Sequence, residues 1–103
     1  MRAELVVIAA LAACGPQHRA VPQAPELHSS AEVRGQRLFQ KFCYQCHPNG
    51  AAGVGPALNN KPLPEVAIRL QIRDGIGPMP SFRSLLRSDE IHAVASYVHA
   101  LRR

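Results

Sequence analysis

The chain has 103 residues, a length that predicts a single domain. Twelve lysine and arginine residues against 7 acidic ones give a formal charge of +5, but no basic run exceeds Arg102-Arg103, which argues against nucleic-acid binding and favours an acidic partner. With no tryptophan and only 5 phenylalanine and tyrosine residues, the apolar core looks thin, and small domains of this kind often need a metal, a disulfide or a cofactor.

The first 13 residues resemble a short signal peptide. Arg2 gives a positive start, and the apolar run at 5–13 is too short to span a bilayer, which takes about 20 residues. The stretch Leu11-Ala12-Ala13-Cys14 resembles the lipobox of bacterial lipoproteins, which implies cleavage before Cys14 and lipid on its thiol. An ordinary secretory signal is the alternative. Both hypotheses place the chain outside the cytoplasm.

Residues 14–28 follow as a predicted tether. Pro16, Pro22 and Pro25 interrupt this stretch, and it has no helical or strand periodicity. We therefore place the folded domain at 29–103. With lipid on Cys14, the tether would attach that domain to a bacterial membrane, facing the periplasm or the cell exterior.

The first predicted helix begins at Ser29 and ends near Phe42. Ser29 as N-cap and Glu32 three residues later form a capping box. Gly35 inside this helix costs about 1 kcal/mol relative to alanine, so we expect another helix to approach it closely.

This helix leads into Cys43-Tyr44-Gln45-Cys46-His47, the Cys-x-x-Cys-His signature of c-type haem attachment. The two thiols add to the two haem vinyl groups, and the adjacent imidazole binds the iron. A zinc site, a thioredoxin-like redox pair and a simple disulfide are the alternatives. Zinc would call for a second close-spaced ligand pair, and the redox pair for a βαβ pattern; neither is found.

Residues 48–60 are rich in glycine, proline and asparagine, which predicts a loop. A metal-binding histidine usually donates its second ring N–H to a carbonyl, and a Gly55-Pro56 turn could supply that acceptor for His47.

A second helix is predicted from Pro64, as the first helical residue, to Asp74, with contacts on more than one face. After it, Met79 stands between Pro78 and Pro80, which exclude a helix there. A rigid loop of this kind suits a thioether ligand for haem iron, and the only other methionine is the initiator.

The last predicted helix begins with Ser88 as N-cap and carries an apolar stripe from Ile91 to Leu101. Acidic residues at its start and arginines at its end suit the helix dipole. His92 and His99 lie away from Tyr97, and we expect them in solvent rather than on iron.

Taken together, these motifs resemble the class I cytochromes c over about 29–101. The resemblance implies a compact all-α fold of three to four helices around one covalent haem c. It implies that Cys43 and Cys46 carry the thioethers and that His47 and Met79 are the axial ligands. It also implies that the Pro56 carbonyl accepts from His47, and that Gly35 and Phe39 pack against Tyr97.

The implied function is electron transfer between a redox donor and an acceptor, without enzymatic catalysis, by an expected monomer. A gas sensor or peroxidase-like protein with a displaceable Met79 is one alternative. A dedicated haem subunit of an oxidoreductase complex is another.

Overall fold

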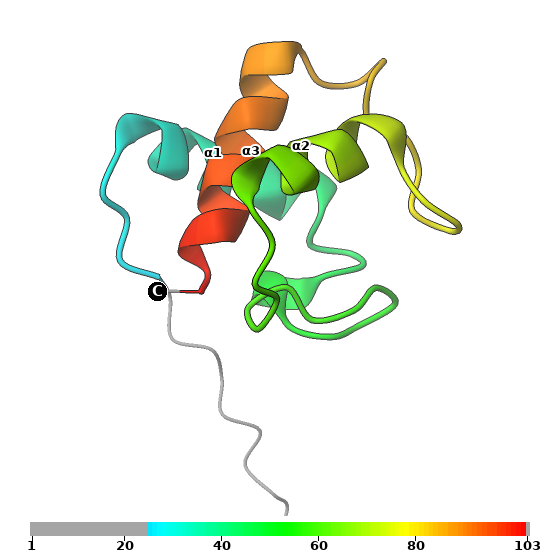
Figure 1. The fold of residues 1–103 in the computed structure, drawn as a ribbon, viewed down its shortest axis with the longest axis horizontal. Helices are drawn as coiled ribbons and strands as arrows, with labels where there is room; N and C mark the ends of the chain where they lie inside the picture. The colour runs from blue at the N-terminus through cyan, green and yellow to red at the C-terminus, as the bar shows by residue number, and fades with distance from the viewer. Residues whose placement is uncertain (1–24, 103) are drawn as a thin grey trace, which may run out of the picture.

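The computed structural model describes residues 25–102, and within them the chain forms three α-helices joined by loops (Figure 1). The helices are α1 (Ser30–Phe42), α2 (Glu65–Asp74) and α3 (Ser88–Ala100), and a short 3₁₀ turn, η2 (Pro48–Gly50), follows α1. The helix α3 packs against both α1 and α2. The predicted all-α fold is confirmed, whereas Cys14, the signal peptide and most of the tether lie outside the described residues.

The start of α1 agrees with its predicted N-cap. The Ser29 hydroxyl accepts from the Glu32 N–H at 3.1 Å. The Glu32 carboxylate accepts instead from the His28 N–H at 2.6 Å, one residue earlier than in a standard capping box. Ordered chain begins before this cap, because Leu27, assigned above to the tether, already packs against the core.

The crossing of α1 and α3 forms the centre of the core. A Cβ added to Gly35 would collide with the Ala93 carbonyl and lie 2.9 Å from Tyr97 Cβ, so only glycine allows this approach. One turn later the Phe39 and Tyr97 rings meet with their centroids 5.2 Å apart. The predicted packing of these three residues is confirmed, and it explains the glycine inside α1.

The helix α3 begins differently from its prediction. Ser88 is the first helical residue and Arg87 is the N-cap, so the assignment of Ser88 as N-cap was wrong. The cause is Glu90, whose carboxylate reaches back and accepts from the Arg87 N–H at 2.9 Å. Most apolar residues of α3 are buried, because α1 packs against one side of this helix and α2 against another.

The helix α2 lies over the cavity with one face inward. Pro64 is its N-cap rather than its first helical residue. Ile68 and Ile72 are buried, whereas Val66 and Leu70 are about half exposed, so the prediction of contacts on two faces fails for the described part of the chain.

Candidate haem-binding site

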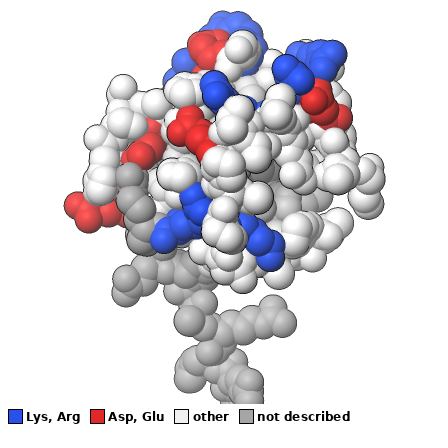
Figure 2. Space-filling view, viewed as in Figure 1, with Lys and Arg blue, Asp and Glu red and all other residues white. Residues whose placement is uncertain are grey.

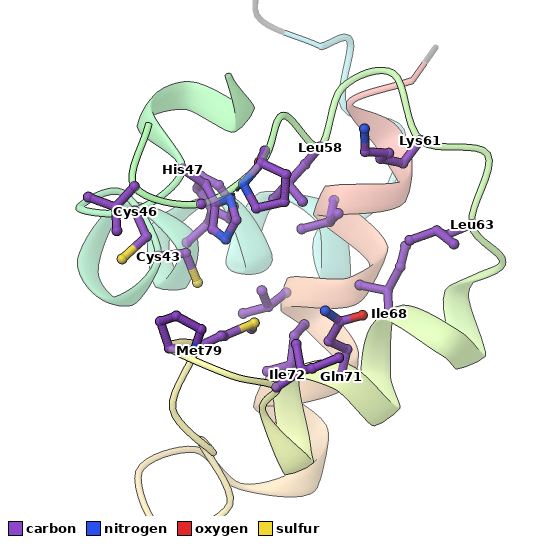
Figure 3. A pocket seen from close by; sticks show the side chains of 18 of the residues that line it. Cys43, Cys46, His47, Leu58, Lys61, Leu63, Ile68, Gln71, Ile72 and Met79 are labelled. Atoms are coloured by element: carbon purple, nitrogen blue, oxygen red, sulfur yellow. Dashed lines mark hydrogen bonds between the residues drawn. The ribbon is translucent and has the colours of Figure 1, made fainter. Parts of the chain in front are cut away.

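A cavity of about 510 Å³ lies between α2, α3 and the two loops that follow α1 and α2 (Figure 3). This volume is within the ~300–1,000 Å³ range of cofactor and ligand sites. Its wall is mainly apolar and includes Phe39, Leu58, Leu63, Ile68, Ile72, Val94 and Val98. Every haem-site residue predicted from the sequence also lines it: Cys43, Cys46, His47, Pro56 and Met79.

His47 is held by the loop that follows it. Its Nδ1 lies 2.8 Å from the Pro56 carbonyl oxygen, and the ring is only 8% exposed. A carbonyl can only accept, so Nδ1 carries the proton and Nε2 keeps a lone pair. Gly55 brings the loop this close, because a Cβ there would collide with the ring. The Gly55 N–H donates to the Cys46 carbonyl at 2.8 Å.

The two cysteines lie at one edge of the cavity, where α1 ends. The Cys43 N–H donates to the Phe39 carbonyl, and the His47 N–H returns to the Cys43 carbonyl, both at 2.9 Å. This turn presents both thiols beside the His47 ring (Figure 3), and neither is in a disulfide. Burial, together with Cys46, raises the pKa of Cys43 to about 12, which keeps its thiol protonated.

Met79 faces the cavity from the loop after α2. Figure 3 shows its sulfur turned inward, across the space from His47. Ile76 and Met79 exchange two backbone hydrogen bonds of 3.0 and 2.9 Å, which close the loop. Gly75 starts this turn at φ 72°, and a Cβ there would lie 2.5 Å from the Met79 carbonyl oxygen. The backbone from which the Met79 side chain projects is therefore held in place.

Two cations that the sequence did not indicate also line the cavity, Lys61 and Arg102. Lys61 lies in a loop rich in proline and asparagine. Arg102 lies at the end of the last helix, where the helix dipole alone accounts for a positive charge. Neither position carries a sequence signal for a site. Only the folded chain brings them to one wall.

His92 and His99 do not line the cavity. His92 is exposed, with its Nδ1 3.2 Å from a Glu65 carboxylate oxygen, and His99 Nδ1 lies 2.7 Å from Arg102 Nη2. Across residues 25–102, no group of three or more His, Cys, Asp or Glu side chains is placed to hold a metal ion. None of the described helices is both long and apolar enough to cross a membrane.

The residues present fit a c-type haem. A flat apolar macrocycle needs an apolar slot, two thiols at one edge and an imidazole with a free nitrogen, and the cavity has all three. One observation suits a ligand that carries negative charge as well. Lys61 and Arg102 line the cavity, and no acidic side chain of the described residues does.

Comparison with known proteins agrees with this fit. The model of the family described as cytochrome C oxidase, cbb3-type, subunit III matches residues 30–98. Cytochrome c6 of Euglena gracilis is 36% identical over a match of 75 residues that covers 63% of this chain and 86% of that protein.

Two further relatives support the same assignment. The cytochrome c subunit of 4-cresol dehydrogenase [hydroxylating] from Pseudomonas putida is 38% identical over 68 residues. That match covers 65% of this chain but only 59% of the relative. The structure of cytochrome c6 from the diatom Phaeodactylum tricornutum superposes with a TM-score of 0.61 at 30% identity, covering 69% of this chain and 93% of that one.

The matched segment contains the thiol pair, the imidazole and the inward-facing thioether, together with all three helices except the last two residues of α3. The cytochrome c6 relatives are electron-transfer proteins with one covalent haem rather than enzymes. The chain belongs to this family, the class I monohaem c-type cytochromes, and is a haem electron carrier.

Proposed function

We propose that this cytochrome holds its haem through thioethers to Cys43 and Cys46, with His47 and Met79 as the two axial ligands. The observation that carries the proposal is the arrangement across one apolar cavity. His47 has an unprotonated Nε2 on one side, the Met79 sulfur faces it from the other, and both thiols lie at the adjoining edge.

When bound, the haem supplies an iron that alternates between the ferric and ferrous states. Pro56 keeps the proton on Nδ1 of His47, which orients the ring and raises the basicity of Nε2. Met79 contributes a neutral thioether, which favours a relatively positive potential. The apolar wall excludes water from the space between His47 and Met79.

The mouth of the cavity suits a brief encounter with another redox protein. Ile76 and Val54 line the cavity, yet their side chains are 64% and 83% exposed. Figure 2 shows mainly uncharged side chains on the lower right of this face and basic side chains in its lower middle. A small apolar contact guided by positive charge fits an acidic partner in a transient complex.

For location, we propose export and lipid attachment at Cys14, with residues 14–28 as the tether and the domain facing the periplasm or the cell exterior as a monomer. The support is the lipobox-like Leu11-Ala12-Ala13-Cys14 and the covalent haem, which cytochromes c receive after export. A tethered domain would meet membrane-bound partners at raised effective concentration.

The test of the ligand set is a visible spectrum of the exported protein when oxidised, when reduced, and when reduced under carbon monoxide. We expect a low-spin c-type spectrum with the weak red sulfur-to-iron band in the oxidised form, and no change under carbon monoxide. Met79→Leu should lose the red band and bind carbon monoxide. Ready carbon monoxide binding by the unaltered protein would reject Met79 as a firm ligand and favour a sensor or peroxidase-like protein.

A second candidate function is favoured by one comparison, the likeness to a cytochrome subunit of a dehydrogenase. In that case this chain would be a dedicated haem subunit of one oxidoreductase complex. Affinity purification of the tagged chain from its native membrane distinguishes the two. A stoichiometric oxidoreductase that survives high salt would indicate a subunit, and recovery of the cytochrome alone would indicate a free carrier.

A further inference from the structure

Arg102 is a charged residue in the wall of a mainly apolar cavity, which the apolar chemistry of that cavity does not explain. Its Nη2 donates to His99 Nδ1 at 2.7 Å, and its Nε is inaccessible and has no partner among the described residues. Charged donors at an apolar wall are normally paired, because leaving them unsatisfied costs several kcal/mol by general estimates. No carboxylate of the described residues lines the cavity to pair with this guanidinium.

A second cation, Lys61, lines the same cavity, and no acidic side chain of the described residues does. The two are linked through the loop after η2. The Lys61 N–H reaches the Leu58 carbonyl at 3.5 Å, and the Leu58 N–H donates to the Gly50 carbonyl at 2.7 Å. Gly50 in turn lies against Leu101, since a Cβ there would be 2.7 Å from Leu101 Cδ1. The loop and the end of α3 thus form one wall.

This wall lies away from the cysteines. Figure 3 shows Cys43 and Cys46 at one side of the cavity and Lys61 at the other, where the ribbon of α3 also ends. On a haem, the two propionate carboxylates project from the edge opposite the two vinyl groups. A haem attached to these cysteines would direct its propionates to the wall that holds Lys61 and Arg102.

We propose that Arg102 and Lys61, the two cations of this wall, bind the haem propionates. The inference rests on the attachment at Cys43 and Cys46 proposed above. Arginine presents its donors in a rigid planar fork that suits a carboxylate, whereas lysine acts as a point charge. His99 positions the fork, because Arg102 Nη2 donates to its Nδ1 at 2.7 Å.

The pairing has a consequence for the potential of the haem. Unneutralised propionates stabilise the ferric form, because its iron carries one more positive charge. Removing the charge of Arg102 should therefore lower the midpoint potential. For charges about 10 Å apart in a partly solvated site, the expected fall in the equilibrium constant for reduction is about three- to tenfold.

The experiment uses the haem-loaded full chain and the variants Arg102→Met, Arg102→Lys and Lys61→Met. Arg69→Met is the matched control, because Arg69 is exposed on α2, outside the cavity. Each variant is first checked for the red sulfur-to-iron band, and its midpoint potential is then measured by spectroscopic redox titration at low and high salt.

We expect Arg102→Met to lower the midpoint potential by an amount that corresponds to a fall of about three- to tenfold in the equilibrium constant for reduction. Lys61→Met should lower the potential less. Arg102→Lys, which keeps the charge, should show at most half of the shift of Arg102→Met. The Arg69→Met shift should be smaller and should vanish at high salt. Equal shifts in Arg102→Met and Arg69→Met, with the red band intact, would overturn the inference. Loss of the red band in the unaltered protein would instead reject the proposed ligand set.

If Arg102→Met does not yield holoprotein, Lys61→Met carries the test. Lys61 lies in an exposed loop, so its replacement should leave folding intact. Since Arg102→Lys keeps the charge and is expected to stay near the potential of the unaltered protein, Lys61→Met then decides: a Lys61→Met potential equal to that of the unaltered protein would overturn the inference.

Discussion

Among single residues, Gly55 determines how His47 is held. Its missing side chain lets the backbone lie against the imidazole, so that the next carbonyl, that of Pro56, can accept from Nδ1. The glycine is needed here for space rather than for an unusual backbone angle, since its φ is not positive.

Gly55→Ala should therefore push the His47 ring off the Pro56 carbonyl. We expect less haem per chain and a loss of about 1–3 kcal/mol in the free energy of unfolding, as for other overpacked sites. The ratio of haem to protein absorbance and thermal melts measure both effects. Ala52→Ser is the control, because Ala52 is exposed in the same loop and does not line the cavity. Normal loading and melting of Gly55→Ala would contradict this role.

Sequence reasoning reached some residues of the site and missed others for a physical reason. Cys43, Cys46 and His47 are found because their chemistry requires close spacing along the chain. Met79 is found because its flanking prolines exclude a helix and predict a rigid loop, which suits a thioether ligand. Arg102 and Lys61 come to line one cavity only after folding, when Leu101 packs on Gly50, and local sequence does not encode that contact.

At the scale of helices, the crossing of α1 and α3 rests on Gly35. Gly35→Ala would gain about 1 kcal/mol of helix propensity but would force the Ala93 backbone away. Overpacking of a tight contact costs about 1–3 kcal/mol, so we expect a net loss of stability. Gln40→Ala, at an exposed position of the same helix, should be neutral or slightly stabilising. Chemical denaturation of both variants decides the point, and a stabilised Gly35→Ala would refute the close crossing.

The same two helices are joined at their surface by Arg34 and Asp89, with Nη1 and Oδ2 2.9 Å apart. Hydrogen bonds from Arg87 and Arg34 lower the pKa of Asp89 from 3.8 to about 2. A carboxyl whose pKa is lower in the folded state stabilises the fold above its unfolded pKa. That contribution is lost as the pH falls from about 4 to about 2.

Asp89→Asn should accordingly melt at a lower temperature than the unaltered protein at pH 6, and the difference should close by pH 2. The side chains of Arg34 and Asp89 are both about half exposed, so the difference in melting temperature should be small and should shrink in high salt. Thermal melts across this pH range at two salt concentrations measure it. A difference that stays constant down to pH 2 would show that Asp89 acts by another route.

Helix positions were more predictable than helix ends and faces. The extent of α1 follows from Ser29 and the apolar spacing, and both agree with the structure. The start of α3 was misplaced by one residue, because Arg87 is the N-cap and its N–H donates to the Glu90 carboxylate. The burial of the outward face of α2 was overestimated. Apolar periodicity indicates which residues could be buried, and only the packing of the folded chain decides which of them are.

At the scale of the whole molecule, Cys14 is proposed to attach the domain to a membrane. Cys14→Ser should move the cytochrome from the membrane fraction to the soluble fraction while leaving its haem spectrum unchanged. Cell fractionation followed by haem staining measures this, and Ala20→Ser, which adds a hydroxyl within the tether, should stay with the membrane. Retention of Cys14→Ser in the membrane would point to an uncleaved signal peptide or a protein partner as the anchor.

The loop that carries Met79 has a consequence for the whole electron carrier. It is closed by its own backbone bonds between Ile76 and Met79, and the Ser81 hydroxyl ties it to the Arg73 carbonyl. The conformational entropy of placing the thioether is therefore lost during folding and not when iron is bound. A weak neutral donor fixed in this way can remain on iron in both oxidation states. Electron exchange would then need no ligand rearrangement, and the small nuclear displacement between the two states would let a brief collision with a partner suffice.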